Sequence, residues 1–310
     1  MAQHRLEPTP ENVVDVFSRD TAPVLTVRPG DTVVVRSLDA SGHLLPQRTP
    51  GDLRPKLIPH AQGHCLTGPI AVTGAEPGMF LEVRLASLRP DGWGWTVAAG
   101  RDTPLNRRLG VEESPPSWLL WSLDSACGLA TEQHGFRVPL RPFLGVIGVA
   151  PAEPGEHSTI PPRAAGGGNI DCRELVAGAV LYLPVLVPGA LLSVGDGHAA
   201  QGDGEVGGTA IECAMTTELA VDLVRERPVP GIHAVTPAGR ITFGFDVDLD
   251  VAMGDALDAM LRWISAVHDL DRPTALALSS AVVDLRITQV VNGNKGVHVM
   301  LDKRYLVGRA

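Results

Sequence analysis

The sequence predicts a mainly β protein with a few helices, built around a β-sandwich-like core and α+β overall. Glycine (34 residues) and proline (26 residues) are abundant in the 310-residue chain, so we expect many turns and few long helices. Several short segments alternate apolar and polar residues, as half-buried strands do. With 44% hydrophobic and 20% charged residues, the chain can bury a sizeable core. We expect residues 1–310 to form a single domain, with two intertwined β-rich halves as the alternative organisation.

The strands are predicted from alternation and from the turns that precede them. Residues 31–36 follow a Pro-Gly turn, and residues 80–86 follow a Glu-Pro-Gly turn and alternate apolar with polar side chains. Residues 241–251 show the clearest alternation, with three aspartates predicted to form a solvated face at Asp246, Asp248 and Asp250. Further strands are expected at 93–98, 143–149, 179–187, 191–194, 206–214, 284–292 and 296–301, the last two joined by an Asn-Gly turn.

Three segments carry helical signals. Residues 216–227 begin with Thr-Thr-Glu, which supplies a capping hydroxyl and an acid for a first helical turn. Residues 255–268 repeat apolar side chains every three to four positions, the spacing of an amphipathic helix. Residues 271–283 carry a proline in what would be the first turn. The polar, proline-containing segments 100–117 and 153–168 are expected to be loops.

Charge and cysteine usage limit the classes of protein to which the chain can belong. The net charge is −9 and the pI about 5.5, which argues against nucleic acid as a partner, since phosphate binding needs basic patches. The most apolar stretch, 179–194, is interrupted by Pro184 and Pro188 and is too short to span a membrane. The N-terminus is polar and the four cysteines are scattered, which predicts a cytoplasmic protein with buried free thiols.

The segment 195–205, Gly-Asp-Gly-His-Ala-Ala-Gln-Gly-Asp-Gly-Glu, concentrates acids and a histidine among small residues. Asp196 and His198 are two positions apart, as are Asp203 and Glu205, so on an extended chain each pair points to one side. Carboxylate oxygens with an imidazole nitrogen suit Zn²⁺ or a similar divalent ion. The glycines allow backbone to come close to a ligand. The alternative is a solvated acidic loop in which Asp203 and Gly204 form a turn.

Other segments supply further candidates. A glycine run delivers Asn169 and Asp171 just before a buried strand, where Asp171 is a candidate ligand or general base and Asn169 a candidate oxyanion donor. Glu212 lies in an apolar segment and must be paired or functional if it is buried. His64 precedes a turn and is a candidate ligand or substrate-binding residue. Glu174 is expected at the surface. For Asp171 the structural alternative is an ion pair with the arginine two residues later.

These motifs together resemble the acetamidase/formamidase family. The matching stretches occur in the expected order and cover about residues 60–215, with a weaker match at 284–292. They are His64-Cys-Leu-Thr-Gly-Pro69, Gly74-Ala-Glu-Pro-Gly78, Pro142-Phe-Leu-Gly-Val-Ile-Gly-Val-Ala-Pro151, Gly167-Gly-Asn-Ile-Asp171, Leu181-Tyr-Leu-Pro184, Gly195 to Glu205, and Gly208-Thr-Ala-Ile-Glu212.

The resemblance implies hydrolysis of a small primary amide to a carboxylate and ammonia, on a β-rich sandwich-like fold. It also implies a divalent metal ion, for which zinc is the first candidate and calcium the alternative, and a homo-oligomer, a dimer or larger. The matching positions for metal binding or catalysis are Asp171, Asp196, His198 and Glu205, with His64 and Glu212 as further candidates.

As a hypothesis, Asp196, His198 and a carboxylate from Asp171 or Glu205 hold the ion, while Glu205 or Glu212 transfers the proton to the leaving nitrogen. Two alternatives remain open at the level of sequence. The first is a hydrolase or lyase on the same scaffold that acts on a different amide or carbonyl compound. The second is a non-catalytic β-sandwich binding protein whose acidic loop holds a structural ion.

Overall fold

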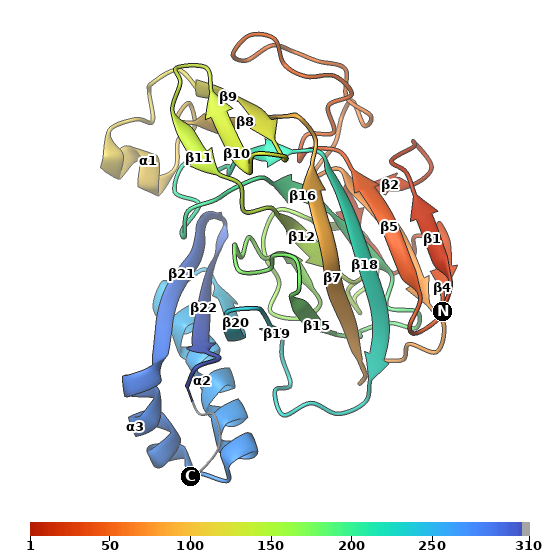
Figure 1. Cartoon of the computed structure of the whole chain (residues 1–310), viewed down its shortest axis with the longest axis vertical. Helices are drawn as coiled ribbons and strands as arrows, with labels where there is room; N and C mark the ends of the chain where they lie inside the picture. The colour runs from red at the N-terminus through yellow and green to blue at the C-terminus, as the bar shows by residue number, and fades with distance from the viewer. Residues whose placement is uncertain (306–310) are drawn as a thin grey trace.

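The computed structural model describes residues 1–305 and confirms the mainly β fold (Figure 1). Two large sheets of nine and eleven strands contain all but two of the strands, which form a separate two-stranded sheet, and three helices complete the secondary structure of these residues. The two-stranded sheet pairs β3 (Val16–Phe17) with β13 (His157–Ser158). The single-domain organisation stays a prediction.

The first large sheet contains the long strands at the centre of Figure 1. It is antiparallel except for the edge pair β1 and β5. In spatial order its strands are β1 (Gln3–Leu6), β5 (Thr32–Ser37), β18 (Met215–Val224), β7 (Phe80–Pro90), β15 (Val180–Pro184), β19 (His233–Val235), β20 (Gly239–Asp246), β22 (Asn294–Asp302) and β21 (Val283–Asn292).

The second large sheet contains the first part of the acidic segment 195–205, residues 195–198. Its main path runs β11 (Arg137–Pro139), β10 (Leu129–Glu132), β9 (Ser117–Asp124), β8 (Trp93–Ala98), β17 (Glu212–Cys213), β16 (Leu192–His198), β12 (Phe143–Gly148) and β14 (Gly167–Asn169). Strand β6 (Leu66–Val72) also pairs with β16 and carries β2 (Val13–Val14) and β4 (Leu25–Val27). Strand β16 is therefore enclosed on both edges.

The core lies where the two large sheets pack together. Val33 and Leu81 from the first sheet and Leu144 and Val194 from the second are all buried members of one apolar cluster. Burial of such a continuous apolar layer, at about 25 cal/mol per Å², is the main term that holds the sheets together. This packing confirms the sandwich-like core that the alternating segments predict.

The predicted helix at 216–227 is wrong. Residues 216–224 belong to β18, a central strand of the first sheet between β5 and β7, and residues 225–227 follow it without helical structure. Their burial alternates residue by residue from Met215 to Val221, the period of a strand, and a threonine pair favours β structure. The Thr-Thr-Glu signal for a cap was therefore outweighed by a period of two that places Leu219 and Val221 in the core.

The helical layer lies at the C-terminal end, below β21 and β22 in Figure 1. Helix α2 (Leu249–His268) begins earlier than predicted, because Asp248 caps it by accepting a hydrogen bond from the Asp250 N–H. The preceding strand therefore ends at Asp246, and the predicted aspartate face of a strand does not form. Helix α3 (Arg272–Val282) and the hairpin of β21 and β22 occur where predicted.

Other sequence predictions had mixed outcomes. The segment predicted as a strand at 206–214 pairs only at β17, and the loop predicted at 100–117 contains the short helix α1 (Pro104–Leu109). All four cysteines are free, and three are buried while Cys127 is exposed. Among residues 1–305 no helix is both long and apolar enough to cross a membrane.

Candidate active site

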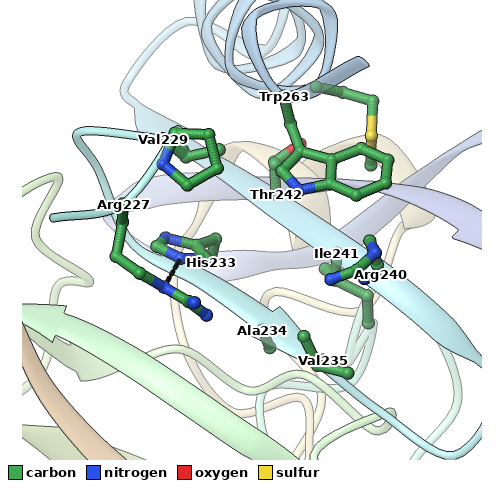
Figure 2. A pocket seen from close by; sticks show the side chains of 11 residues that line it. Arg227, Val229, His233, Ala234, Val235, Arg240, Ile241, Thr242 and Trp263 are labelled. Carbon is green, nitrogen blue, oxygen red and sulfur yellow. Dashed lines mark hydrogen bonds between the residues drawn. The ribbon is translucent and has the colours of Figure 1, made fainter. Parts of the chain in front are cut away.

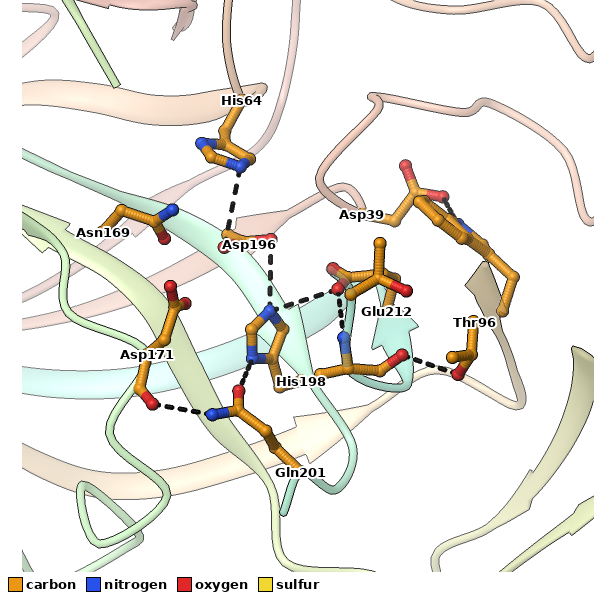
Figure 3. Close-up of polar contacts among 12 residues, drawn as sticks. Asp39, His64, Thr96, Asn169, Asp171, Asp196, His198, Gln201 and Glu212 are labelled. Atoms are coloured by element: carbon orange, nitrogen blue, oxygen red, sulfur yellow. Dashed lines mark hydrogen bonds and ion pairs between the residues drawn. The ribbon is translucent and has the colours of Figure 1, made fainter. Parts of the chain in front are cut away.

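Strand β16 brings Asp196 and His198 into the buried centre of the second sheet (Figure 3). Both side chains are almost fully buried, and Asp196 Oδ1 lies 3.4 Å from His198 Nε2. The segment predicted as a strand at 191–194 thus continues through the histidine, which explains why two residues two apart act on the same side. The solvated-loop alternative is excluded for this pair because both side chains lie in the interior.

Glu212 enters the site from the neighbouring strand. Strand β17 pairs with β16 so that Glu212 stands directly opposite His198. Glu212 Oε1 lies 3.4 Å from His198 Nε2 and accepts a hydrogen bond of 2.9 Å from the Ala210 N–H. Glu212 is therefore the buried acid in an apolar strand that the sequence predicted to be paired or functional.

Asp171 and Glu205 reach the same point from loops. Asp171 and Asp196 form one group of ligand atoms with His198, and Glu205 and Glu212 form a second, each with all atoms within 4.8 Å of one another. We call these four acids and His198 the carboxylate cluster. His198 is shared by the two groups, so it lies at the centre of the cluster.

A hydrogen bond determines which nitrogen of His198 faces the acids. Gln201 Nε2 donates to the Asp171 carbonyl at 2.8 Å, so the Gln201 Oε1 accepts from His198 Nδ1, also at 2.8 Å. The Nδ1–H proton is thereby fixed on the Gln201 side, and Nε2 is directed at Asp196 and Glu212 with no hydrogen-bond partner. A second residue that orients the far nitrogen is the usual arrangement for a metal-binding histidine.

The carboxylate cluster is electrostatically crowded. Burial raises the pKa of Glu205 to about 7 and that of Glu212 to about 8, with the charge on Asp196 adding to both. Burial and then the Glu205 charge raise the pKa of Asp171 well above its usual range. Burial opposes ionisation of Asp196 too, but the charges of His198 and His64 hold its pKa below the usual range. Repulsion among these acids would be relieved by a cation between them.

The two carboxylates next to His198, those of Asp196 and Glu212, also determine the charge of its imidazole. Burial lowers the pKa of His198, but the charges of Glu212 and Asp196 outweigh burial and raise it well above the usual value. Without a metal ion the imidazole therefore supplies the positive charge that the acids require. A divalent ion would take over this role and leave His198 neutral.

Three of the acids stand on strained backbone. Asp171, Asp196 and Glu205 have φ angles of 52°, 56° and 46°, in the left-handed region that residues other than glycine rarely adopt. Strain of this kind costs about 1–3 kcal/mol per residue and concentrates at functional sites. The strained backbone supports a function for these acids that goes beyond packing.

The space between the acids fits a metal ion. Asp171 Oδ1, His198 Nε2, Glu205 Oε2 and Glu212 Oε2 are all buried without a hydrogen-bond partner. A Cβ added at Gly145 of β12 would lie 2.5 Å from Asp196 Oδ2 and 2.7 Å from Asp171 Oδ1, so this glycine leaves the point of convergence open. One imidazole nitrogen with several carboxylate oxygens is a donor set suited to zinc.

Two glycines of the acidic segment allow close packing of strands, whereas the sequence indicated that they allow backbone to approach a ligand. A Cβ at Gly195 would lie 2.9 Å from the Cys65 carbonyl oxygen, and one at Gly197 would lie 2.6 Å from that of Cys213. These glycines let neighbouring strands approach β16. Gly145, on the adjacent strand, is the glycine that leaves room among the acids.

The structure also locates the remaining predicted residues. His64 Nε2 lies 4.0 Å from Asp196 Oδ2, and the His64 backbone N–H donates to Thr159 Oγ1. Asn169 is buried next to the cluster in Figure 3, with Nδ2 donating to the Ile160 carbonyl and Oδ1 without a partner. Its proposed role as an oxyanion donor stays a prediction.

Two predictions for neighbouring acids are corrected. Glu174, expected at the surface, is buried and pairs with Arg141 and Arg286 because these two cations compensate its desolvation. Asp171 does not pair with Arg173; its Oδ2 accepts a hydrogen bond of 2.7 Å from Asn292 Nδ2.

Sequence reasoning missed three residues that shape the site. Gly145 provides the space, Gln201 orients His198, and Asn292 at the end of β21 binds Asp171 across 121 positions of sequence. Gln201 lies inside the acidic segment, so its polar side chain was a usable signal. Asn292 was assigned to a hairpin turn, and nothing local indicated that this turn reaches the cluster.

A pocket adjoins the carboxylate cluster. Its volume is about 590 Å³, and Glu205 and Gln201 form part of its wall. The volume lies within the range of small-molecule binding sites, about 300–1,000 Å³. Glu205 is the member of the cluster that lines this pocket, so it connects the buried acids to a space that a ligand can enter.

A second pocket, shown in Figure 2, lacks the chemistry of the first. Arg227 and Arg240 line it, with their guanidinium groups over the rings of Tyr182 and Trp263. His233 Nδ1–H donates to the Gly231 carbonyl, and its Nε2 accepts from Arg227 Nε. No acid lines this pocket, so it lacks the carboxylates that mark the first.

We expect His233 to make the protein less stable in acid. Burial, then the charges of Arg227 and Arg240, lower its pKa from 6.5 to about 4. The unfolded chain therefore binds the proton first, and stability falls as the pH drops from 6.5 towards 4, by up to about 3 kcal/mol for this group. In urea unfolding across this range, His233→Gln should reduce the dependence on pH by up to about 1.4 kcal/mol per unit.

The control for this experiment is His134→Gln, which removes an exposed histidine. It should leave the pH dependence of the unfolding free energy at the wild-type value. Equal slopes for His233→Gln and wild type would show that His233 titrates normally in the folded protein.

Comparisons with known proteins give a consistent assignment. A model of the acetamidase/formamidase family matches residues 2–158 and 152–301. A putative formamidase of Schizosaccharomyces pombe is 27% identical over 287 residues, covering 71% of this chain and 69% of that protein. The acetamidase of Mycolicibacterium smegmatis is 28% identical over 267 residues, covering 66% and 64%. The chain therefore spans about two thirds of the length of these curated relatives.

A solved structure extends the similarity over the whole fold. The crystal structure of an acetamidase from Bacillus halodurans has a TM-score of 0.85 and 29% identity, covering 97% of this chain and 98% of that chain. Because the family model matches nearly all of the sequence, the chain belongs to the acetamidase/formamidase family.

Proposed function

We propose that this protein is a metal-dependent amidohydrolase that cleaves a short-chain primary amide, of the formamide or acetamide class, to a carboxylate and ammonia. The carboxylate cluster is the observation that carries the proposal, because its buried, unpartnered oxygens converge on His198 Nε2. The names of the relatives, formamidase and acetamidase, support the substrate class.

The residues that would hold the ion are Asp171, Asp196 and His198, which form one of the two groups of potential ligands. A divalent ion at this position, zinc in preference to calcium, supplies positive charge near the amide carbonyl and makes water more acidic. The Gln201 side chain keeps the proton on His198 Nδ1, so that Nε2 retains its lone pair. The Asn292 amide directs Asp171 by binding one of its oxygens.

We assign proton transfer to Glu205. An amide nitrogen leaves poorly unless it is protonated, so a general acid must reach the substrate. Glu205 belongs to the carboxylate cluster and also lines the adjoining pocket, whereas Glu212 lies deeper and is held by the Ala210 N–H. Glu205 is therefore placed to take a proton from water and to deliver it to the departing nitrogen, while Glu212 faces His198 Nε2 from the neighbouring strand.

The proposed cellular setting follows from the same chain. The free cysteines support a cytoplasmic location, where thiols remain reduced. Large exposed apolar side chains, including Leu53 (95% exposed) and Phe136 (74% exposed), support a homo-oligomer in which a second copy covers part of this surface.

Removal of the metal tests the proposal directly. Elemental analysis of the purified protein should find a divalent metal, with zinc expected first. Ammonia release from formamide and acetamide should fall at least about a hundredfold after chelation, because the cluster then lacks its main positive charge. Added Zn²⁺ should restore the activity.

Two results would count against the proposal. Undiminished amide hydrolysis by fully metal-free protein would refute metal dependence. A metal-loaded protein that releases no ammonia from any short amide, but melts at a lower temperature after chelation, would favour the binding-protein alternative.

A further inference from the structure

The pocket next to the carboxylate cluster is much larger than a formamide or acetamide molecule. It is open to solvent with a volume of about 590 Å³, and much of its wall is apolar, including Trp121, Val138 and Ile211. A substrate that fills this space needs an apolar body in addition to its amide group. The volume and apolar wall of the pocket therefore indicate features of the substrate that the carboxylate cluster alone does not.

The charges in and behind the pocket wall mostly cancel. Arg141 pairs with Glu174, and Arg286 bridges Glu174 Oε1 and Asp203 Oδ2, both at 2.7 Å. This network contains two cations and two anions and is neutral. It also explains Asp203, whose partner is Arg286 and which belongs to neither potential metal-binding group.

Arg173 is the cation in the wall that this network leaves out. Within residues 1–305 it has no ion pair and no hydrogen bond, and its Nε is buried without a partner. Glu174 and Asp203 are bonded to Arg141 and Arg286 and form no ion pair with Arg173. An unpaired guanidinium in a partly desolvated wall is unfavourable until an anion binds to it.

We propose that Arg173 binds a carboxylate at the far end of the substrate, so that the preferred substrates are primary amides with an apolar middle and a terminal carboxylate. This inference rests on the proposed amide hydrolysis. Guanidinium and carboxylate form paired, charge-assisted hydrogen bonds with defined geometry. The acids of the cluster repel the substrate carboxylate, which directs the amide end to Glu205 and the carboxylate end to Arg173.

The reaction is the same hydrolysis carried out on a longer molecule. Water oxygen bonds to the amide carbon, the C–N bond breaks, and nitrogen leaves as ammonia with the proton that Glu205 transfers. A monoamide of a dicarboxylic acid thus gives the dicarboxylate and ammonium. No oxidant or further reactant is required.

Isosteric substrate pairs test the role of Arg173. Ammonia release is measured for succinamate against succinamide and for glutaramate against glutaramide, which differ by a carboxylate in place of an amide. Wild type should prefer the acid amides, by about 10- to 100-fold in kcat/KM, the range of a charged hydrogen-bonded contact. Arg173→Met should bring the preference close to one, mainly through KM.

The control is Arg108→Met, which removes an exposed arginine and the same unit of charge from the protein. It should retain the wild-type preference. Binding of glutarate, measured by calorimetry, supplies a readout that needs no turnover and should weaken at least tenfold in Arg173→Met.

The outcomes separate the two proposals. Turnover of acetamide with no preference for acid amides, or a preference that Arg173→Met leaves intact, overturns the role of Arg173 and leaves the proposed function standing. No ammonia from any amide overturns the proposed function. In that case the calorimetry decides: glutarate binding that depends on Arg173 supports the anion site, and no binding overturns it.

Discussion

Asp196→Asn should lower kcat/KM for amide hydrolysis by at least about a thousandfold, equivalent to about 4 kcal/mol of transition-state stabilisation. The substitution keeps the size of the side chain, and asparagine tolerates the φ of 56° at this position. It removes one negative charge from the point where Asp171, Asp196 and His198 converge. The metal content of the purified variant should fall together with its activity, because the amide is a poorer ligand than the carboxylate.

The matched control is Asp284→Asn, which makes the same change at an exposed position of β21. It should retain wild-type activity and metal content. Full activity in Asp196→Asn would refute the proposed site, whereas lost metal with a preserved circular dichroism spectrum would show that the loss is local. His198→Ala should have a comparable effect, since His198 is shared by both groups of potential ligands.

Gly145→Ala should inactivate the enzyme although glycine has no functional group. The added Cβ would lie 2.5 Å from Asp196 Oδ2, 2.7 Å from Asp171 Oδ1 and 2.9 Å from His198 Cε1. Approaches below 3.0 Å are essentially never seen for a Cβ, so these side chains must move. Because their positions define the space for an ion, we expect a loss of at least about a thousandfold in kcat/KM, together with lost metal.

Gly254→Ala provides the contrast. An added Cβ there meets nothing within 4 Å, and the residue lies within helix α2. Alanine in an exposed helical position should stabilise the protein by about 0.5–1 kcal/mol and leave activity unchanged. An active Gly145→Ala enzyme with bound metal would mean that the point of convergence is not used.

The comparison of sequence with structure shows where local patterns were sufficient. The alternation and turns of the strands and the proline-marked start of α3 follow from neighbouring residues, so they could be predicted. The segment 216–227 could not be decided by its capping signal, because the register of β18 between two other strands determined its conformation. Pairing partners of this kind lie far away in the sequence, so they cannot be recognised from neighbouring residues.

The residues of the site likewise divide into those that local motifs predicted and those that only tertiary contacts revealed. Asp196 and His198 were predicted from their spacing of two, and Asp171, Glu205 and Glu212 from the same motifs and the family resemblance. Gln201 and Asn292 orient the site through hydrogen bonds, one of them across 121 positions. Arg173 was considered only as a partner of Asp171, and the structure leaves it as the unpaired cation of the pocket.

The sequence by itself determined the identity of the acids and the histidine, the mainly β character and the family, because these depend on residue type, spacing and periodicity. Only the tertiary structure decided that the acids are buried, that they meet around His198 Nε2, and that Gly145 leaves space between them. The physical reason is that strands β12, β16 and β17 and the loops carrying Asp171 and Glu205 come together only when the second sheet forms. Burial, repulsion and coordination space are properties of that assembled arrangement.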